Sequence, residues 1–241
     1  MAPPARTSPA SAPAPCAPPV VARMTALAQL RAGRKARRIP QLALGLVGYG
    51  ASVMLLVLSG LGAAGWNVLT EGTAQTLGIS FGVATNLISL LVLLAWIPLR
   101  ELPGLGTLLN VVIVGFAADA TAIVVPAPQG LLAQIGCFAL GLVALAFFDA
   151  LYLGAQFGAG PRDGVMTGLV RLSRLPVAVV RTGIEVTAAC TGWLLGGTVG
   201  VGTVLVALCL GPLVGFFLPR VAVRLPDAAS APARRPSRRR G

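Results

Sequence analysis

Six long apolar segments dominate the middle of this 241-residue sequence and leave few folds open to it. Each is about as long as the roughly 20 helical residues that cross a hydrocarbon core of about 30 Å. Only helices and closed barrels satisfy their backbone hydrogen bonds inside lipid. The segments are continuous and do not alternate, which favours helices over barrel strands. We predict membrane-spanning helices near residues 41–60, 79–99, 105–125, 131–154, 176–196 and 198–219.

The composition is that of a chain solvated mainly by lipid. Charged residues make up 11% of the sequence, against about 25% in soluble domains. The net charge of +12 alone would suggest a nucleic-acid binder, but the basic residues lie in the tails and in short loops. Aromatic residues make up only 5% of the chain, too few for a surface on which bases stack. We therefore expect no nucleic-acid partner.

Low-complexity tails flank the membrane region, which we place at residues 41–220. Residues 1–40 are rich in Ala, Pro and Ser and end in basic residues, and residues 221–241 are also basic. Such composition is typical of disordered segments. Residues 21–38 are equally compatible with an amphipathic helix that lies on anionic lipid head groups. Both interpretations of this segment stay open.

The distribution of basic residues predicts the orientation in the membrane. Six spans place both termini on one side, and the loops after the first, third and fifth spans contain no Lys or Arg. All 19 basic residues therefore fall on the side of the termini. The positive-inside rule makes that side cytoplasmic. We predict a multi-pass protein of the cell membrane with both termini in the cytoplasm.

A repeat divides the membrane region into two parts. Ala43–Val47 recurs letter for letter as Ala139–Val143, an offset of 96 (139 − 43), and Gly104–Thr107 recurs with one change as Gly200–Thr203. Each copy has three spans, with a Gly-rich loop and a short helix after the first span. Because three is odd, the second copy enters the bilayer upside down, as in many secondary transporters. The repeats cover about residues 41–125 and 131–220.

The most charged loop of the membrane region has an uncharged counterpart in the first copy. The loop Gly158–Leu169 carries Arg162 and Asp163, and at the same offset the first copy carries Trp66 and Asn67. The first-copy loop is predicted to face outward, where aromatic side chains are common at the interface. The exchange of charge for an aromatic residue is therefore consistent with an inverted repeat.

Several glycine-punctuated motifs carry a family resemblance. They are Gly160–Leu169, Val180–Thr182 with Glu185, Gly192–Thr203, and Trp96–Arg100 through Gly104–Asn110. Together they resemble the YczE/YitT-type family of bacterial integral membrane proteins over about residues 41–220. The resemblance implies a multi-pass cytoplasmic-membrane protein and gives no substrate. Members usually show Gly-Pro-Trp-Asp in the first-copy loop, where this chain has Ala64-Gly65-Trp66-Asn67 and so lacks the carboxylate.

Charged residues inside or beside the spans are candidates for a substrate or coupling site. Glu185 lies near mid-span, where a lone carboxylate costs about 2.5–3.5 kcal/mol on insertion scales and should face protein or water. Arg181 lies four residues earlier on the same helix face. Either the two form a local pair that fixes the span, or Glu185 exchanges a proton while Arg181 or Arg162 holds an anion. The candidates are Glu185, Arg181, Arg162, Asp163 and Asp149.

Two of these candidates have further open interpretations. Asp163 either caps the short helix that follows Gly160-Pro161 or forms a gate with Arg162 at the cytoplasmic mouth. Asp149, near the inner end of the fourth span, is a candidate partner of Arg162 or Arg181.

The residues that are missing narrow the function. The chain has no histidine, and its cysteines lack ligand spacing. It has no GxSxG or HExxH motif. We therefore expect no enzyme activity, metal or cofactor. The pattern favours a small secondary transporter or exporter of unknown substrate, and the alternative is a non-transporting accessory or regulatory protein that acts through helix and tail contacts. The sequence leaves homo-oligomer formation open.

Overall fold

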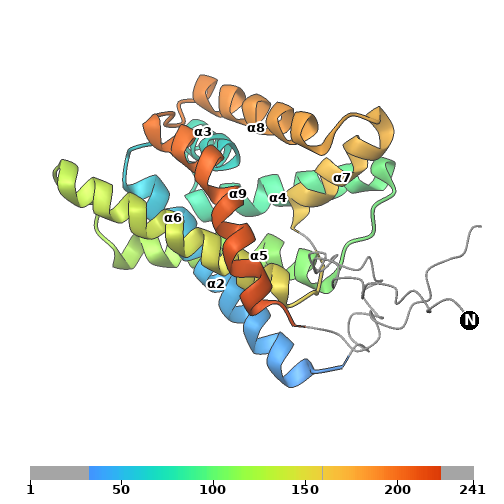
Figure 1. Ribbon diagram of the computed structural model, residues 1–241. Helices are drawn as coiled ribbons and strands as arrows, with labels where there is room; N and C mark the ends of the chain where they lie inside the picture. Colours follow the sequence, from blue (N-terminus) through green and yellow to red (C-terminus); the bar gives the residue numbers. More distant parts are fainter. Residues whose placement is uncertain (1–32, 159, 224–241) are drawn as a thin grey trace, which may run out of the picture.

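The computed structural model describes residues 33–158 and 160–223 of the chain (Figure 1). This part is all helical, as predicted, and contains no strand. Most of the predicted tails, including most of the candidate interfacial helix at 21–38, lies outside the described residues, whereas residues 35–40 of the predicted N-terminal tail are helical. The helices are α2 (Lys35–Leu58), α3 (Gly65–Leu77), α4 (Phe81–Leu99), α5 (Leu105–Val124), α6 (Leu131–Gly154), α7 (Pro161–Ser173), α8 (Val177–Leu194) and α9 (Val201–Val221).

Five of these helices, α2, α4, α5, α6 and α9, are long and apolar enough to cross a membrane. The segment predicted at 176–196 forms α8, which carries Arg181 and Glu185 and is not one of the five. The short helices α3 and α7 have 13 residues each, about 20 Å at 1.5 Å per residue. The predicted helical membrane protein is therefore found, with five spans supported by length and composition.

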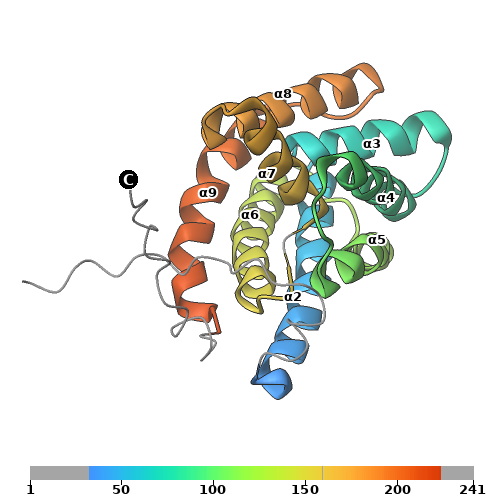
Figure 2. The same ribbon diagram turned by 90° about the vertical axis from the view of Figure 1, so that its right-hand side faces the viewer.

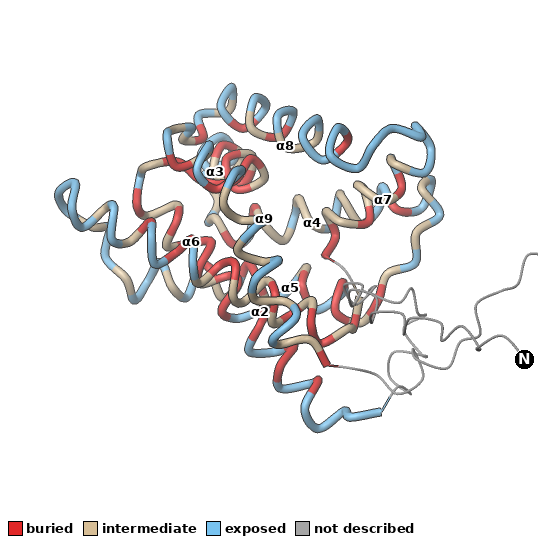
Figure 3. Tube along the Cα trace, in the orientation of Figure 1, coloured by how far each residue is buried: buried red, intermediate tan, exposed pale blue. Residues whose placement is uncertain are grey.

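The side chains on the outer surface agree with a lipid environment. Figure 3 shows most of α8 and the start of α6 exposed. Ile123 and Leu132, at the two ends of the loop between α5 and α6, are 86% and 87% exposed. Large exposed apolar areas are rare on soluble monomers and typical of membrane contact.

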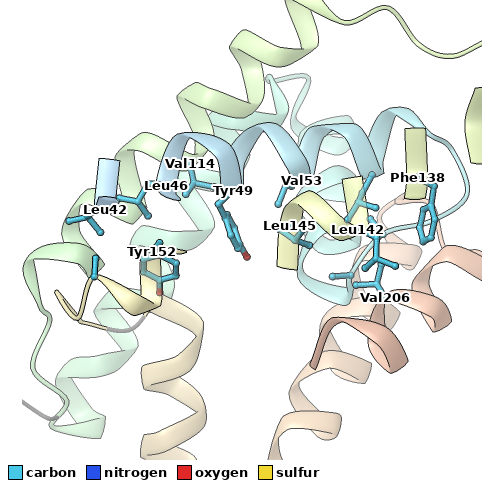
Figure 4. Packing of buried hydrophobic residues seen from close by; sticks show 14 of the residues in the cluster. Leu42, Leu46, Tyr49, Val53, Val114, Phe138, Leu142, Leu145, Tyr152 and Val206 are labelled. Carbon is cyan, nitrogen blue, oxygen red and sulfur yellow. The ribbon is translucent and has the colours of Figure 1, made fainter. Parts of the chain in front are cut away.

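The centre of the molecule is the crossing of α2 and α6. α2 packs along both α5 and α6, and α6 packs along α9, so these four helices form the core. Gly45 allows the close approach, because an added Cβ there would lie 2.7 Å from the backbone nitrogen of Tyr152. Leu46, Leu145 and Val206 are at most 1% exposed and fill the space around the crossing (Figure 4).

The remaining helices pack in two pairs, each joining helices far apart in the sequence. α3 packs on α8, where Gly192 lies against the backbone of Val68 and Leu69. α7 packs on α4, where Gly164 lies against the indole ring of Trp96. The indole nitrogen of Trp96 donates a hydrogen bond of 2.8 Å to the carbonyl oxygen of Pro161. Small residues thus let helix backbones meet closely, as is common in membranes.

One interhelical contact is present in the first half of the chain and has no strong counterpart in the second. α4 packs along α5 and is held there by Asp119, which accepts hydrogen bonds from the Ser80 hydroxyl (2.6 Å) and the Gly82 N–H (2.7 Å). α8 and α9 instead diverge from the loop that joins them (Figures 1 and 2). A gap therefore opens between α8 and α9.

Candidate functional site

A cavity of about 500 Å³ occupies this gap. α8 and α9 supply two of its walls, and the starts of α3 and α7 close one side. Its lining includes all five residues predicted as site candidates, Glu185, Arg181, Arg162, Asp163 and Asp149. Residues from three different helices, α6, α7 and α8, thus meet at one place.

Asp163 is fixed by the start of its own helix. It is the third residue of α7, and its Oδ2 accepts a hydrogen bond of 3.1 Å from the N–H of Gly160, the residue before the helix. This geometry corresponds to the capping interpretation of Asp163. Loss of water around the carboxyl raises the pKa of Asp163 above its ordinary value, while Arg162, Gly160 and Arg181 lower it by less.

Glu185 bonds to another helix and not to its neighbour Arg181. Its Oε2 accepts a hydrogen bond of 3.2 Å from the N–H of Gly65, the first residue of α3. Within residues 33–158 and 160–223, one ion pair is formed, between Arg171 and Glu101 at 2.7 Å, and it lies outside the cavity. The local Arg181–Glu185 pair considered from the sequence is therefore not formed in this structure.

The two arginines of the cavity are not neutralised by contact with a carboxylate. The guanidinium carbon of Arg162 lies 5.7 Å from the ring centre of Tyr49. Arg181, on α8, is exposed. Asp149 and Asp163 are near enough for Arg181 to act on them electrostatically. No ion pair forms between them in the described part of the chain. Both guanidinium groups therefore keep donors for another partner.

Tyr152 contributes a polar atom that sequence reasoning missed. The residue is 2% exposed, its side chain lines the cavity, and its hydroxyl has no hydrogen-bond partner among the described residues. A buried polar group without a partner costs about 1–3 kcal/mol. A tyrosine within an apolar span is indistinguishable from core packing in the sequence. Figure 4 shows Tyr49 near it, at a ring separation of 6.3 Å.

The first-copy loop also reaches this region. Trp66 lines the cavity, and Asn67 is 6% exposed and lines a smaller adjoining pocket. Arg162 and Asn110 border both spaces. The loop residues that correspond in the repeat therefore approach each other near the centre of the molecule.

The donor set does not form a metal site. Over the described residues, no three side chains of His, Cys, Asp or Glu lie close enough to hold a metal ion. The cavity combines two guanidinium groups, three carboxylates and an unpartnered hydroxyl with apolar walls. That combination suits a ligand with both charged and apolar parts.

Comparison with known proteins agrees with the resemblance seen in the motifs. Residues 36–219 match the model of a family of unknown function, DUF6198. An uncharacterized protein of Haemophilus influenzae (strain ATCC 51907 / DSM 11121 / KW20 / Rd) is 41% identical over 184 residues, which are 76% of this chain and 83% of that relative. The uncharacterized membrane protein YczE of Bacillus subtilis (strain 168) is 32% identical over 161 residues, 66% of this chain and 75% of YczE.

A third relative is also similar to this chain, whereas the comparison with solved structures found no match. The uncharacterized protein YyaS of Bacillus subtilis (strain 168) is 28% identical over 182 residues, 74% of this chain and 90% of YyaS. No solved structure matches the chain. The chain therefore belongs to the family of unknown function DUF6198 and is a membrane protein of the YczE type.

Proposed function

We propose that the protein is a small secondary transporter or exporter, without enzyme activity, and that the cavity between α8 and α9 is its substrate site. The proposal is supported mainly by one observation: five charged residues and Tyr152, whose hydroxyl has no partner among the described residues, line one cavity of about 500 Å³. If these charges served only to fix helices, ion pairs between them would be expected. Arg162 and Arg181 instead border the cavity without an ion pair among the described residues.

The proposal includes two inverted repeats, which the helix bounds support. α6 begins and ends 96 residues after α2 (131 − 35 and 154 − 58), and α7 begins and ends 96 residues after α3 (161 − 65 and 173 − 77). α8 and α9 begin at the same offset from α4 and α5 (177 − 81 and 201 − 105). The letter-for-letter match in the sequence has the same spacing.

Matching loop contacts support the same division. The N–H of Gly106 donates to the carbonyl oxygen of Phe157 at 2.7 Å, and the N–H of Gly202 donates to that of Leu61 at 2.8 Å. Donors and acceptors are each 96 residues apart (202 − 106 and 157 − 61). Each half thus holds the start of a helix from the other half, as expected for repeats related by a pseudo-two-fold axis.

We also propose that α8 is a sixth span. It has 18 residues, about 27 Å of helix, and its charged residues Arg181 and Glu185 line the cavity. The loops α4–α5 and α7–α8 lie at one end of the molecule, and α2–α3, α5–α6 and α8–α9 lie at the other (Figure 1). With the positive-inside rule, the end with basic residues is cytoplasmic.

Topology is tested with a tag at residues 126–128, between α5 and α6. Six spans with cytoplasmic termini predict that an impermeant reagent labels this tag from outside intact cells. Labelling only after the membrane is opened would contradict the proposed topology.

Transport is tested in two steps. Purified protein is screened with small solutes for an increase in the unfolding temperature, and solutes that stabilise it are then followed across proteoliposomes with an imposed pH gradient. We expect saturable flux that falls in Glu185→Gln and remains in Glu101→Gln, a matched change outside the cavity. A bound solute that wild-type protein does not move, or equal flux in both variants, would argue against the proposal.

A further inference from the structure

Two of the three carboxylates of the cavity have a hydrogen-bond donor within the protein. Asp163 accepts from the N–H of Gly160, and Glu185 accepts from the N–H of Gly65. Both N–H groups lie at the first turn of a helix, α7 or α3. The helix dipole places partial positive charge there and stabilises a carboxylate. Two of the three carboxylates therefore already accept a hydrogen bond at the start of a helix.

The positive charges of the cavity have weaker partners: Arg162 lies over the Tyr49 ring, and both arginines act on carboxylates only through space. Arg162 and Arg181 make no ion pair and no hydrogen bond with a side chain or backbone of the described residues. Asp149 lies near Arg181 but too far for an ion pair. Each guanidinium carries five N–H donors in a planar fork that matches the oxygens of carboxylate, sulfonate or phosphate groups. All the N–H donors of these two guanidinium groups are therefore open to a ligand.

The unpartnered Tyr152 hydroxyl adds an independent indication of a ligand. Tyr152 is 2% exposed and lines the same cavity as both arginines, and its buried hydroxyl has no hydrogen-bond partner among the described residues. The N–H of Gly160 lies near the hydroxyl and acts on it, but its hydrogen bond of 3.1 Å goes to Asp163. An oxygen of a bound anion would accept the hydroxyl proton and remove the cost of leaving it unpaired.

Much of the cavity lining is apolar. α9 supplies Val204, Ala207 and Leu208, and α8 supplies Ile184 and Val186. Leu208 and Val204 are 66% and 58% exposed, so this wall continues onto the outer surface of the molecule. A ligand that fills the space therefore has an apolar part, and about 500 Å³ lies within the usual range of about 300–1,000 Å³ for ligand sites.

We infer that the cavity binds an amphipathic organic anion, with its charged head at Arg162, Arg181 and the Tyr152 hydroxyl and its apolar body along α9. This inference rests on the proposal that the cavity is the substrate site. The same chemistry is offered by a free organic acid and by an anionic lipid, so the experiment must separate the two sources.

The test compares three probes with the same alkyl chain on protein held in phosphatidylcholine nanodiscs. Octanesulfonate, octanol and octyltrimethylammonium are titrated while the unfolding temperature is recorded. We expect octanesulfonate to stabilise the protein and the other two to have little effect. Arg162→Gln and Arg181→Gln should each weaken octanesulfonate binding by about tenfold or more, the usual effect of losing one charge-assisted contact.

Matched variants separate recognition from folding. Arg174→Gln makes the same change outside the cavity and should bind octanesulfonate like wild type. Arg181→Lys keeps the charge and should retain most of the binding even if Arg181→Gln unfolds. Equal or tighter binding of octyltrimethylammonium would overturn the inference. Unchanged octanesulfonate binding in the folded Arg162→Gln/Arg181→Gln double variant would do the same.

Two further arms identify the source of the anion and separate this inference from transport. Adding phosphatidylglycerol to the nanodiscs should weaken octanesulfonate binding through Arg162 and Arg181 if the natural ligand is an anionic lipid, and should have no such effect if it is a free acid. A cation that the protein carries across proteoliposomes would overturn the anion site and leave transport standing. An anion that binds in the cavity and is never carried across the membrane would support the anion site and contradict the transport proposal.

Discussion

Asp119, on α5, ties the start of α4 to its partner helix. Its carboxylate accepts the Ser80 hydroxyl at 2.6 Å and the Gly82 N–H at 2.7 Å, both at the start of α4. A hydrogen bond to a charged group contributes about 1.5–3 kcal/mol, and water will replace part of it at this half-buried site. We therefore expect Asp119→Ala to lower the free energy of unfolding by about 2–4 kcal/mol.

The assay is thermal unfolding of the purified protein. For a chain of this size, about 1 kcal/mol corresponds to about 2–4 °C, so Asp119→Ala should unfold roughly 5–15 °C lower. Asp119→Asn keeps one acceptor for the Gly82 N–H and should lose about half as much. The control is Thr121→Ala on the same helix, because the Thr121 hydroxyl bonds only to the carbonyl of Ala117 in its own helix. If Asp119→Ala and Thr121→Ala unfold at the same temperature, the role given to Asp119 is wrong.

Three further predictions follow from contacts elsewhere. Gly45→Ala should destabilise the protein by about 1–3 kcal/mol through overpacking. It should lower the unfolding temperature more than Gly141→Ala, because the added Cβ would lie 2.7 Å from a backbone atom at Gly45 and 3.1 Å at Gly141. The reverse order would contradict the packing described at the crossing of α2 and α6. Arg171→Ala should cost at most about 1 kcal/mol, because its pair with Glu101 is partly exposed, and a larger loss that persists in high salt would refute this. The raised pKa of Asp163 means that its carboxyl group binds a proton more tightly in the folded protein than in the unfolded chain. The contribution of Asp163 to stability therefore falls as pH rises from the ordinary aspartate pKa through the raised one. Asp163→Asn should flatten the plot of unfolding temperature against pH, and an unchanged plot would contradict this prediction.

Much of the helix pattern is predictable from the sequence because apolar runs have clear ends. The segments expected at 131–154 and 105–125 are observed as Leu131–Gly154 and Leu105–Val124. The first span was expected from residue 41, whereas α2 begins at Lys35. The difference arises at Arg38, which is fully buried. Its guanidinium donates to the carbonyl oxygens of Ala155 and Gln156 at 2.9 and 3.0 Å. Such a long-range contact leaves no local signal.

The candidate site was predictable in its charges and not in its arrangement. A carboxylate in an apolar span such as Glu185 is conspicuous in the sequence, because burial in lipid is costly. Its bond to Gly65 joins residues 120 positions apart and has no sequence pattern. Tyr152 was missed for the same reason: only the fold shows that it lines a cavity and that its buried hydroxyl has no partner among the described residues.

The packing of α3 on α8 limits how the cavity can change shape. Gly192 and Gly72 bring the two helix backbones into direct contact, and Glu185 ties α8 to the first residue of α3. α9 is held separately, at its start by Leu61 and beyond its end by Gly154. We therefore expect a displacement of α8 toward α9 to carry α3 with it, so that Trp66 at the start of α3 travels with the wall that bears Arg181. With Trp96 and Trp193 replaced, the fluorescence of the Trp66 indole should therefore report the width of the cavity.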